Sequence, residues 1–167
     1  MDYRKEYEKW LASPALSEDE RNELKAIAND EKEIENRFYG PLEFGTAGLR
    51  GTMYVGLHNM NRHVIRWATQ GFANVIRAEG EEAMQKGVAV CMDCRNHSAE
   101  FARETACVMA ANGIHVRLFE SLRPTPELSF AVREYGCEAG INVTASHNPK
   151  EYNGYKVYWS DGAQLPP

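Results

Sequence analysis

The sequence predicts an α/β fold: a three-layer α/β/α domain on a mixed, mainly parallel sheet, preceded by an N-terminal helical arm. Beyond residue 87, short apolar segments alternate with helical segments, which is typical of a parallel sheet covered on both faces. The first forty residues differ, because they are rich in Glu, Lys, Asn and Ala with spaced apolar positions. The composition is 43% hydrophobic and 26% charged, close to the globular average. We therefore divide the chain into a helical arm, residues 1–40, and one domain, residues 41–167.

The arm is predicted to hold two or three exposed or half-exposed helices. Ser17 is followed three positions later by Glu20, the spacing of a capping box that begins a helix. The helical pattern continues to about Phe38, and the pair Gly40 and Pro41 ends it.

The domain is predicted to begin with a long helix and then to alternate strands and helices. Apolar residues recur at helical spacing over residues 61–78, with Asn61 as the N-cap. The elements expected after it are a strand at 88–92, a helix at 98–111, a strand at 114–119, a helix at 126–134 and a strand at 139–145. Asn153 and Gly154 predict a tight hairpin turn into an antiparallel strand at 155–159.

Charge and composition exclude several classes of function. The net charge of −5 gives no general attraction to nucleic acid or to an anionic membrane, so an anionic ligand must be bound locally. The chain lacks a run of about 18 apolar residues and an apolar N-terminal signal, so we expect a cytoplasmic protein without a membrane partner.

The four cysteines are expected to be free thiols. Cys91 and Cys94 form a C-x-x-C pair, but two residues three apart on a strand point to opposite faces and no second pair completes a zinc site. Cys107 and Cys137 are expected in the core. A thioredoxin-like redox role is a weak alternative, which a strongly lowered thiol pKa would favour.

The segment after the third strand is the candidate site. Residues 139–145 lead into Ser146, His147, Asn148 and Pro149, and loops at the carboxyl ends of parallel strands are where ligands bind. Backbone N–H groups in such a turn can bind phosphate oxygens, and Lys156 adds a positive charge nearby. The residues alone also allow Ser146 to be a helix cap and His147 an ordinary surface residue. A phosphate-binding loop is one possibility among several.

Three motifs together resemble one family. Residues 144–149 read TASHNP and, with NGYK at 153–156, closely resemble the phosphoserine loop of the α-D-phosphohexomutases. Residues 44–51 read FGTAGLRG and resemble that family's N-terminal motif. Asp93, Arg95 and Ser98 are similar to its D-x-R-x-x-S segment. The string at 148–159 is most similar to the phosphoglucomutase/phosphopentomutase branch.

The resemblance implies a role for each site residue. Ser146 would carry a phosphoryl group, give it to a sugar monophosphate and take it back from a sugar 1,6-bisphosphate. His147 and Lys156 would assist proton transfer and stabilise the moving charge, and Arg50 would contact the same phosphate. Thr46 would contact phosphate or shape its loop. Asp93 and Arg95 are left out of the catalytic set, because a D-x-R at a strand end often braces loops.

The resemblance also implies parts that this sequence lacks. The phosphate on Ser146 would be one Mg²⁺ ligand, and the other ligands would come from an Asp-rich loop of a second domain that has no counterpart here. We therefore expect a truncated chain without domains II–IV, whose partners are sugar phosphates and the missing domains, and which is inactive alone. Glucose is the expected sugar, with pentose or mannose next. The alternative is a non-catalytic regulatory or assembly domain that retains the fold.

Overall fold

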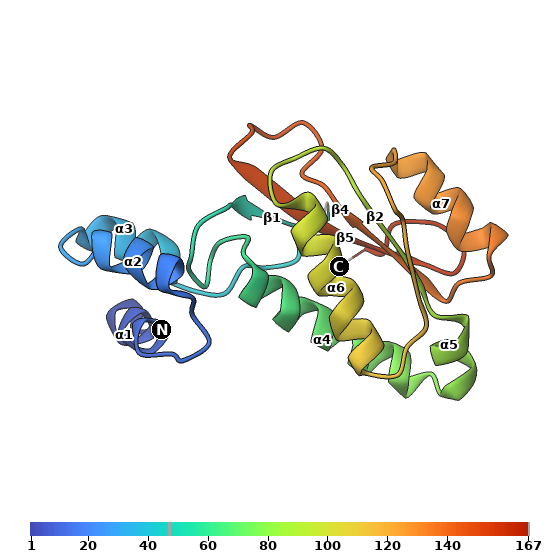
Figure 1. Ribbon diagram of the computed structural model, residues 1–167, viewed down its shortest axis with the longest axis horizontal. Helices are drawn as coiled ribbons and strands as arrows, with labels where there is room; N and C mark the ends of the chain where they lie inside the picture. The colour runs from blue at the N-terminus through green and yellow to red at the C-terminus, as the bar shows by residue number, and fades with distance from the viewer. Residues whose placement is uncertain (47, 167) are drawn as a thin grey trace.

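The structure, a computed structural model, describes residues 1–46 and 48–166. A helical arm lies at one end of an α/β body, and the two meet along the segment that leads into the first strand (Figure 1). Ala47, which belongs to the motif at 44–51, and Pro167 fall outside the described residues.

The arm consists of three short helices. They are α1 (Tyr3–Leu11), α2 (Glu18–Ala26) and α3 (Glu31–Phe38). The predicted capping box is confirmed, because the Ser17 hydroxyl accepts from the Glu20 N–H while the Glu20 carboxylate accepts from the Ser17 N–H. Leu24, Ile34 and Phe38 are fully buried in a small core of the arm. Val55 and Leu57, from a loop of the body, complete that core and attach the arm.

The body is built on one five-stranded sheet. Its strands are β1 (Leu49–Thr52), β2 (Val88–Met92), β3 (Val116–Leu118), β4 (Ala139–Val143) and β5 (Tyr152–Trp159), in the order β1-β5-β4-β2-β3. β2 pairs in parallel with both β3 and β4, whereas β5 is antiparallel to β4 and to β1. Four strands thus run in one direction and β5 opposes them, which confirms the predicted mixed, mainly parallel sheet.

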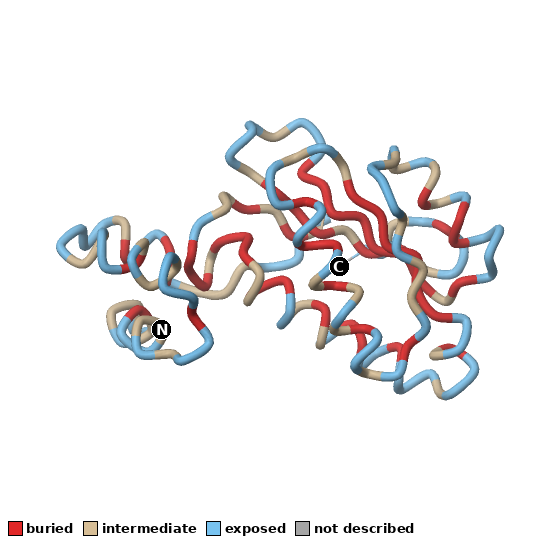
Figure 2. The backbone as a smooth tube through the Cα atoms, viewed as in Figure 1, coloured by how far each residue is buried: buried red, intermediate tan, exposed pale blue. Residues whose placement is uncertain are grey.

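Helices cover both faces of the sheet. On one face, α4 (Arg62–Ala78) and α6 (Ser98–Ala111) pack together over a continuous apolar core, and the short helix α5 (Glu81–Lys86) follows α4. On the other face, α7 (Thr125–Glu134) packs on β2 and β4. The central strands are therefore buried along their length (Figure 2), as the three-layer prediction requires.

The structure corrects the predicted hairpin. Asn153 and Gly154 are not a turn but lie inside β5, and the chain reverses instead through residues 144–151. The Asn153 side chain is fully buried, and its Nδ2 donates to the Asn96 carbonyl (2.9 Å) and to Ser98 Oγ (3.0 Å). These long-range partners hold the asparagine in an extended strand, and no local pattern could have shown them.

Two further elements were not predicted. β1 is only four residues long and contains a glycine, and α5 is six residues long, so neither has enough periodicity to be recognised. The predicted N-cap Asn61 is confirmed, because its side chain accepts from the backbone N–H groups of His63 and Val64.

Candidate functional site

Ser146 lies at the carboxyl end of β4 in a left-handed backbone conformation. Its φ is 57°, a value that few residues other than glycine adopt, and its side chain is exposed. The Ser146 N–H donates to Thr144 Oγ1 (3.0 Å), and the Asn148 N–H donates to the Ala145 carbonyl (3.1 Å). The turn therefore presents the serine hydroxyl to solvent instead of to the core.

Arg95 fixes the conformation of this turn through hydrogen bonds to its backbone. Its guanidinium donates to four carbonyl oxygens of the loop, those of Ser146 (2.8 Å), Asn148 (2.7 Å), Pro149 (2.9 Å) and Tyr152 (3.0 Å). A planar guanidinium has five N–H donors in a fixed arrangement, so one side chain can fix several carbonyls at once. Hydrogen bonds that involve Ser146 and the residues before and after it therefore maintain its strained backbone conformation.

Asp93 orients Arg95 and joins it to Thr144 and Ser98 in one hydrogen-bond network. It accepts from Thr144 Oγ1 (2.6 Å) and from Ser98 Oγ (2.7 Å), and its carboxylate lies 3.4 Å from Arg95 Nε. The D-x-R-x-x-S segment thus braces the serine loop. Sequence reasoning left Asp93 and Arg95 out of the catalytic set, and the geometry gives them this positioning role.

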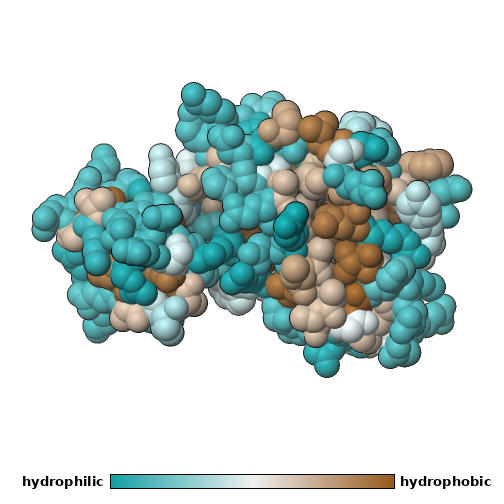
Figure 3. Space-filling model, viewed as in Figure 1, coloured by the Kyte–Doolittle hydropathy of each residue, from teal (hydrophilic) through white to brown (hydrophobic). Residues whose placement is uncertain are grey.

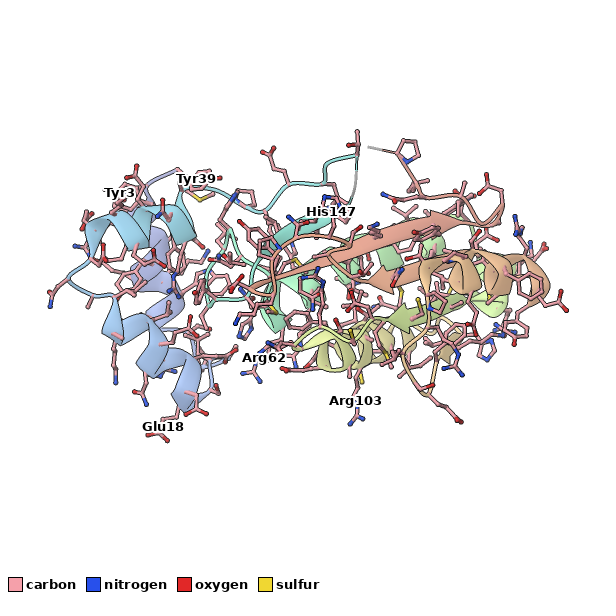
Figure 4. All side chains as sticks on the ribbon, turned by 90° about the horizontal axis from the view of Figure 1, so that it is seen from above. Tyr3, Glu18, Tyr39, Arg62, Arg103 and His147 are labelled. Carbon is pink, nitrogen blue, oxygen red and sulfur yellow. The ribbon has the colours of Figure 1, made fainter. Side chains whose placement is uncertain are left out.

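His147 is a titratable group beside the serine hydroxyl. Its Nδ1 lies 3.4 Å from Ser146 Oγ, and the ring is exposed. In the view of Figure 4, His147 lies towards the upper side of the molecule, and Arg62 and Arg103 lie towards the lower side. A histidine in this position can accept or donate a proton at the serine oxygen.

Arg50 and Lys156 share one face of the sheet beside the serine loop. Arg50 on β1 pairs with Gly154 on β5, and Lys156 is two residues further along β5, so the two side chains point to the same side. On this side α7 packs mainly on β2 and β4, and it reaches β5 through Tyr158, which shares its apolar cluster. Arg50 Nη1 donates to Asn148 Oδ1 (2.8 Å), which links the cation directly to the loop.

The two cations form a local positive region in an acidic protein. Within residues 1–46 and 48–166, neither Arg50 nor Lys156 makes a salt bridge with a carboxylate. Burial, and to a smaller extent the charge of Arg50, lower the pKa of the Lys156 ammonium. Two cations without anionic partners, next to an exposed hydroxyl, are suited to an anionic ligand such as phosphate.

Gly48 allows the backbone just before β1 to pack closely against β5. Its φ is +82°, and a Cβ at this position would lie 2.4 Å from the Tyr155 carbonyl and 3.1 Å from Lys156 Cα. Gly45 and Gly48 exchange backbone hydrogen bonds, which closes a tight turn. Thr46 is exposed in that turn, and its carbonyl accepts from Gln164 Nε2 (3.0 Å). Its predicted contact with phosphate stays a prediction.

The described residues do not by themselves fit a magnesium ion. They contain no group of three or more His, Cys, Asp or Glu side chains that could hold a metal. The groups around Ser146 are a guanidinium, an ammonium and an imidazole, whereas Mg²⁺ prefers oxygen ligands. The described residues alone therefore do not complete a magnesium site.

The cysteines do not form a redox centre. Cys91 is buried and donates to Asn142 Oδ1 (3.2 Å), and burial raises the pKa of its thiol to about 12. Cys94 is exposed, so the two sulfurs of the C-x-x-C lie in different environments. A raised thiol pKa is the reverse of what a redox cysteine requires. Cys137 is buried as predicted, but the prediction for Cys107 is wrong, because it is on the exposed side of α6.

Fold and site together define a class of protein: an α/β domain with an exposed serine hydroxyl beside two cations, a site suited to an anionic ligand. The comparison with family models identifies the class further. Residues 41–167 match the model described as "Phosphoglucomutase/phosphomannomutase, alpha/beta/alpha domain I", and the chain belongs to this family. The resemblance to the N-terminal domain of the α-D-phosphohexomutases is thereby confirmed.

The chain is similar to curated enzymes named phosphopentomutase and to others named phosphoglucomutase. It is 43% identical over 146 residues to a phosphopentomutase of Homo sapiens, a match that covers 83% of this chain and 24% of the relative. It is also 43% identical over 144 residues to a phosphoglucomutase of Staphylococcus aureus, covering 85% and 26%. The chain thus spans about a quarter of the length of the curated relatives it matches.

The fold also matches solved structures. A putative phosphomannomutase from Thermus thermophilus superposes with a TM-score of 0.68 at 31% identity, covering 75% of this chain and 27% of that one. A phosphoglucomutase/phosphomannomutase family protein from Burkholderia thailandensis gives a TM-score of 0.60 at 26% identity, covering 73% and 27%. Among the described residues of the present chain, no helix is both long and apolar enough to cross a membrane.

Proposed function

We propose that this chain is the phosphoserine-bearing domain of a sugar-phosphate mutase that interconverts hexose 1-phosphate and hexose 6-phosphate, with glucose as the expected sugar. The observation that carries the proposal is the exposed Ser146 hydroxyl, which the Arg95 hydrogen bonds hold in a strained turn beside Arg50 and Lys156. Strain of this kind persists only where the surroundings over-determine it, and it is common at active sites.

The proposed reaction moves one phosphoryl group between two hydroxyls. The bond from phosphorus to Ser146 Oγ breaks while a bond from phosphorus to a sugar oxygen forms, so the sugar monophosphate becomes a 1,6-bisphosphate. The sugar hydroxyl loses its proton to a base and the serine oxygen gains one, and His147 is close enough to Ser146 Oγ to exchange that proton. The bisphosphate then returns its other phosphate to Ser146.

Arg50 and Lys156 are proposed to stabilise the charge on the transferring phosphate. Phosphoryl transfer depends mostly on positioning and on charge neutralisation, and two cations without carboxylate partners supply both. When bound, Mg²⁺ would neutralise further charge, and a phosphate on Ser146 would be its one ligand from this chain. The remaining ligands and the sugar-selecting parts are proposed to belong to the three quarters of the relatives that this chain does not span.

Phosphoryl incorporation tests the proposal. The full-length protein proposed to contain this chain is incubated with glucose 1,6-bisphosphate and Mg²⁺, and intact-mass and peptide mass spectrometry locate any added phosphoryl group. We expect a single group on Ser146, none in Ser146→Ala, and an unchanged yield in Ser160→Ala, a serine of the turn after β5. Incorporation at another residue, or equal incorporation in Ser146→Ala, would contradict the proposal. Sustained conversion of glucose 1-phosphate by the 167 residues alone would contradict the assignment of missing parts.

The lowered pKa of Lys156 gives a second test. Because its ammonium loses its proton below the ordinary lysine value of 10.5, phosphate binding should weaken as the pH rises towards that value. Lys156→Arg should keep the charge and move this loss to higher pH, whereas Lys150→Arg, at an exposed lysine of the same loop, should not move it. An unchanged pH profile in Lys156→Arg would show that Lys156 does not contact the phosphate.

A further inference from the structure

An apolar groove of about 440 Å³ lies between α4, the segment that leads into β1 and the segment that follows β5. We propose that this groove, here called the α4 groove, is the docking site of the segment that directly follows residue 167 in a longer protein. The proposal rests on the proposed function only in that this chain is one part of a longer mutase. Leu42, Leu49, Trp67 and Leu165 are among the lining residues, and none of the described residues that line the groove is charged. An occupant is therefore expected to be apolar.

Large apolar side chains are exposed along the α4 groove. The exposed fractions are 60% for Trp67 and 48% for Val75 on α4, 46% for Phe44 before β1 and 41% for Leu165 after β5. All four residues line the groove. Single exposed apolar residues are ordinary on protein surfaces, but a contiguous apolar patch marks an interaction surface. The α4 groove has this character, because its exposed side chains come from three separate segments and face one hollow.

The path of the chain after β5 leads to the α4 groove. Gln164 forms an antiparallel bridge with Tyr158, and the Leu165 N–H donates to the next carbonyl along β5 (2.8 Å), so this segment follows the edge of β5. Further along the same edge, the place beside β5 is taken by β1, which begins at Leu49. The chain beyond Pro166 therefore cannot continue in the sheet. Pro166 itself lines the α4 groove, so the chain leaves the sheet on this face.

The two faces at this edge of the sheet differ in their chemistry. Arg50 and Lys156 point to one face, whereas Leu49 and Val157, their neighbours on β1 and β5, point to the other and line the α4 groove. Burial stabilises an apolar segment on the groove face, because the opposite face presents two cations. A segment docked in the groove would also pack against the two strands that carry Arg50 and Lys156.

The continuation of the chain is a better occupant than a second copy of the protein. This chain spans about a quarter of the length of its curated relatives, so a longer protein has enough chain to fill the groove. A segment that starts beside Pro166 is tethered at the groove, and a short tether gives an effective concentration of about 1 mM. A second copy has to bind from free solution, where its concentration is much lower.

Photo-crosslinking in the full-length protein tests the proposal. Trp67→p-benzoylphenylalanine places a crosslinking group on the groove wall, and peptide mass spectrometry locates the product after irradiation. We expect a crosslink within one chain, to the peptide that directly follows residue 167. Tyr135→p-benzoylphenylalanine, at a similarly exposed aromatic residue after α7, should not reach that peptide. A product that joins two copies, that reaches only residues 1–167, or that reaches a distant part of the longer chain would overturn the proposal.

A charge on the groove wall gives an independent measurement. Val75 is half-exposed in this structure, so Val75→Asp should leave the described domain folded but oppose docking, because a buried carboxylate without a partner is costly. Hydroxyl-radical labelling of Trp67 in the full-length protein should be slow, and Val75→Asp should accelerate it about tenfold. Phe130→Asp, at an exposed apolar residue of α7 outside the groove, should leave the rate unchanged. Equal rates in both variants, or fast labelling in the unsubstituted protein, would contradict docking.

The outcomes separate the α4 groove from the proposed function. A crosslink to the following segment, in a protein whose Ser146 takes up no phosphoryl group, would retain the α4 groove and contradict the mutase. Phosphorylation of Ser146 in a full-length protein whose Trp67 stays exposed would retain the mutase and contradict the α4 groove.

Discussion

The body, which carries the candidate site, and the arm are stabilised by different physical means. In the body, a continuous apolar core fixes the sheet, and Arg95 and Asp93 fix the serine loop to its end. In the arm, a small apolar core is bordered by ion pairs: Arg37 pairs with Glu23 and Glu33 inside the arm, and Glu20 pairs with Arg62 of the body. Figure 3 shows apolar side chains gathered over the body and a largely hydrophilic arm. The body should therefore resist changes of charge and pH that loosen the arm.

The largest effect is expected at Gly154, where β5 closely approaches the chain on both of its sides. A Cβ at Gly154 would lie 2.6 Å from the Thr144 carbonyl and 2.7 Å from the Leu49 carbonyl, so Gly154→Val should separate β5 from both neighbours. We expect a loss of about 3 kcal/mol in the free energy of unfolding, measured in urea. Gly71→Ala, on α4 with no atom within 4 Å of the added Cβ, should instead stabilise by up to about 1 kcal/mol. Equal effects would contradict the close packing at β5.

The serine loop should be the next most sensitive part. Arg95→Ala removes four bonds to loop carbonyls and should cost about 2 kcal/mol. Amide hydrogen exchange should rise in peptides covering residues 144–152, and phosphoryl incorporation at Ser146 should fall. Arg103→Ala, at an exposed arginine of α6, is the control. Normal loop protection in Arg95→Ala would show that the turn is stable without this arginine.

The arm should loosen without unfolding the body. The Arg37 side chain is 7% exposed and pairs with Glu23 and Glu33, so Arg37→Ala leaves two carboxylates without a partner. Because both carboxylates retain some exposure, the expected cost is about 1.5 kcal/mol, below that of a fully buried pair. Hydrogen exchange should increase in α1–α3 while β2 and β4 stay protected. A uniform loss of protection in both parts would contradict their independence.

The smallest effect is a pH dependence at the border of the arm. Burial lowers the pKa of His63, although Glu20 opposes the shift from 3.1 Å. Below the ordinary histidine value of 6.5, the unfolded chain therefore binds a proton that the folded chain does not, and stability falls as the pH drops through this range. His63→Gln should remove this slope and His115→Gln should not. An unchanged slope in His63→Gln would assign it to another group.

Local sequence patterns predicted most of the fold. Caps such as Asn61 and Ser17, and the alternation of apolar segments after residue 87, are properties of neighbouring residues, and the structure confirms them. The hairpin at Asn153 and Gly154 was wrong because a buried side-chain network, invisible in the local pattern, holds that pair in a strand. The signal that could have corrected it is the length of β5, whose aromatic residues continue on both sides of Gly154.

The sequence by itself determined the fold class, the family and the identity of the candidate site residues, because these depend on residue types and on their order. The tertiary structure alone decided how they are arranged: Arg50 and Lys156 on one sheet face, Arg95 beneath the serine turn, and the arm beside Arg50. Residues as far apart in sequence as Arg50 and Asn148 meet because β1 and β4 both flank β5. Which strands become neighbours is a long-range property, because it depends on burial and backbone hydrogen bonding between segments that are distant in sequence.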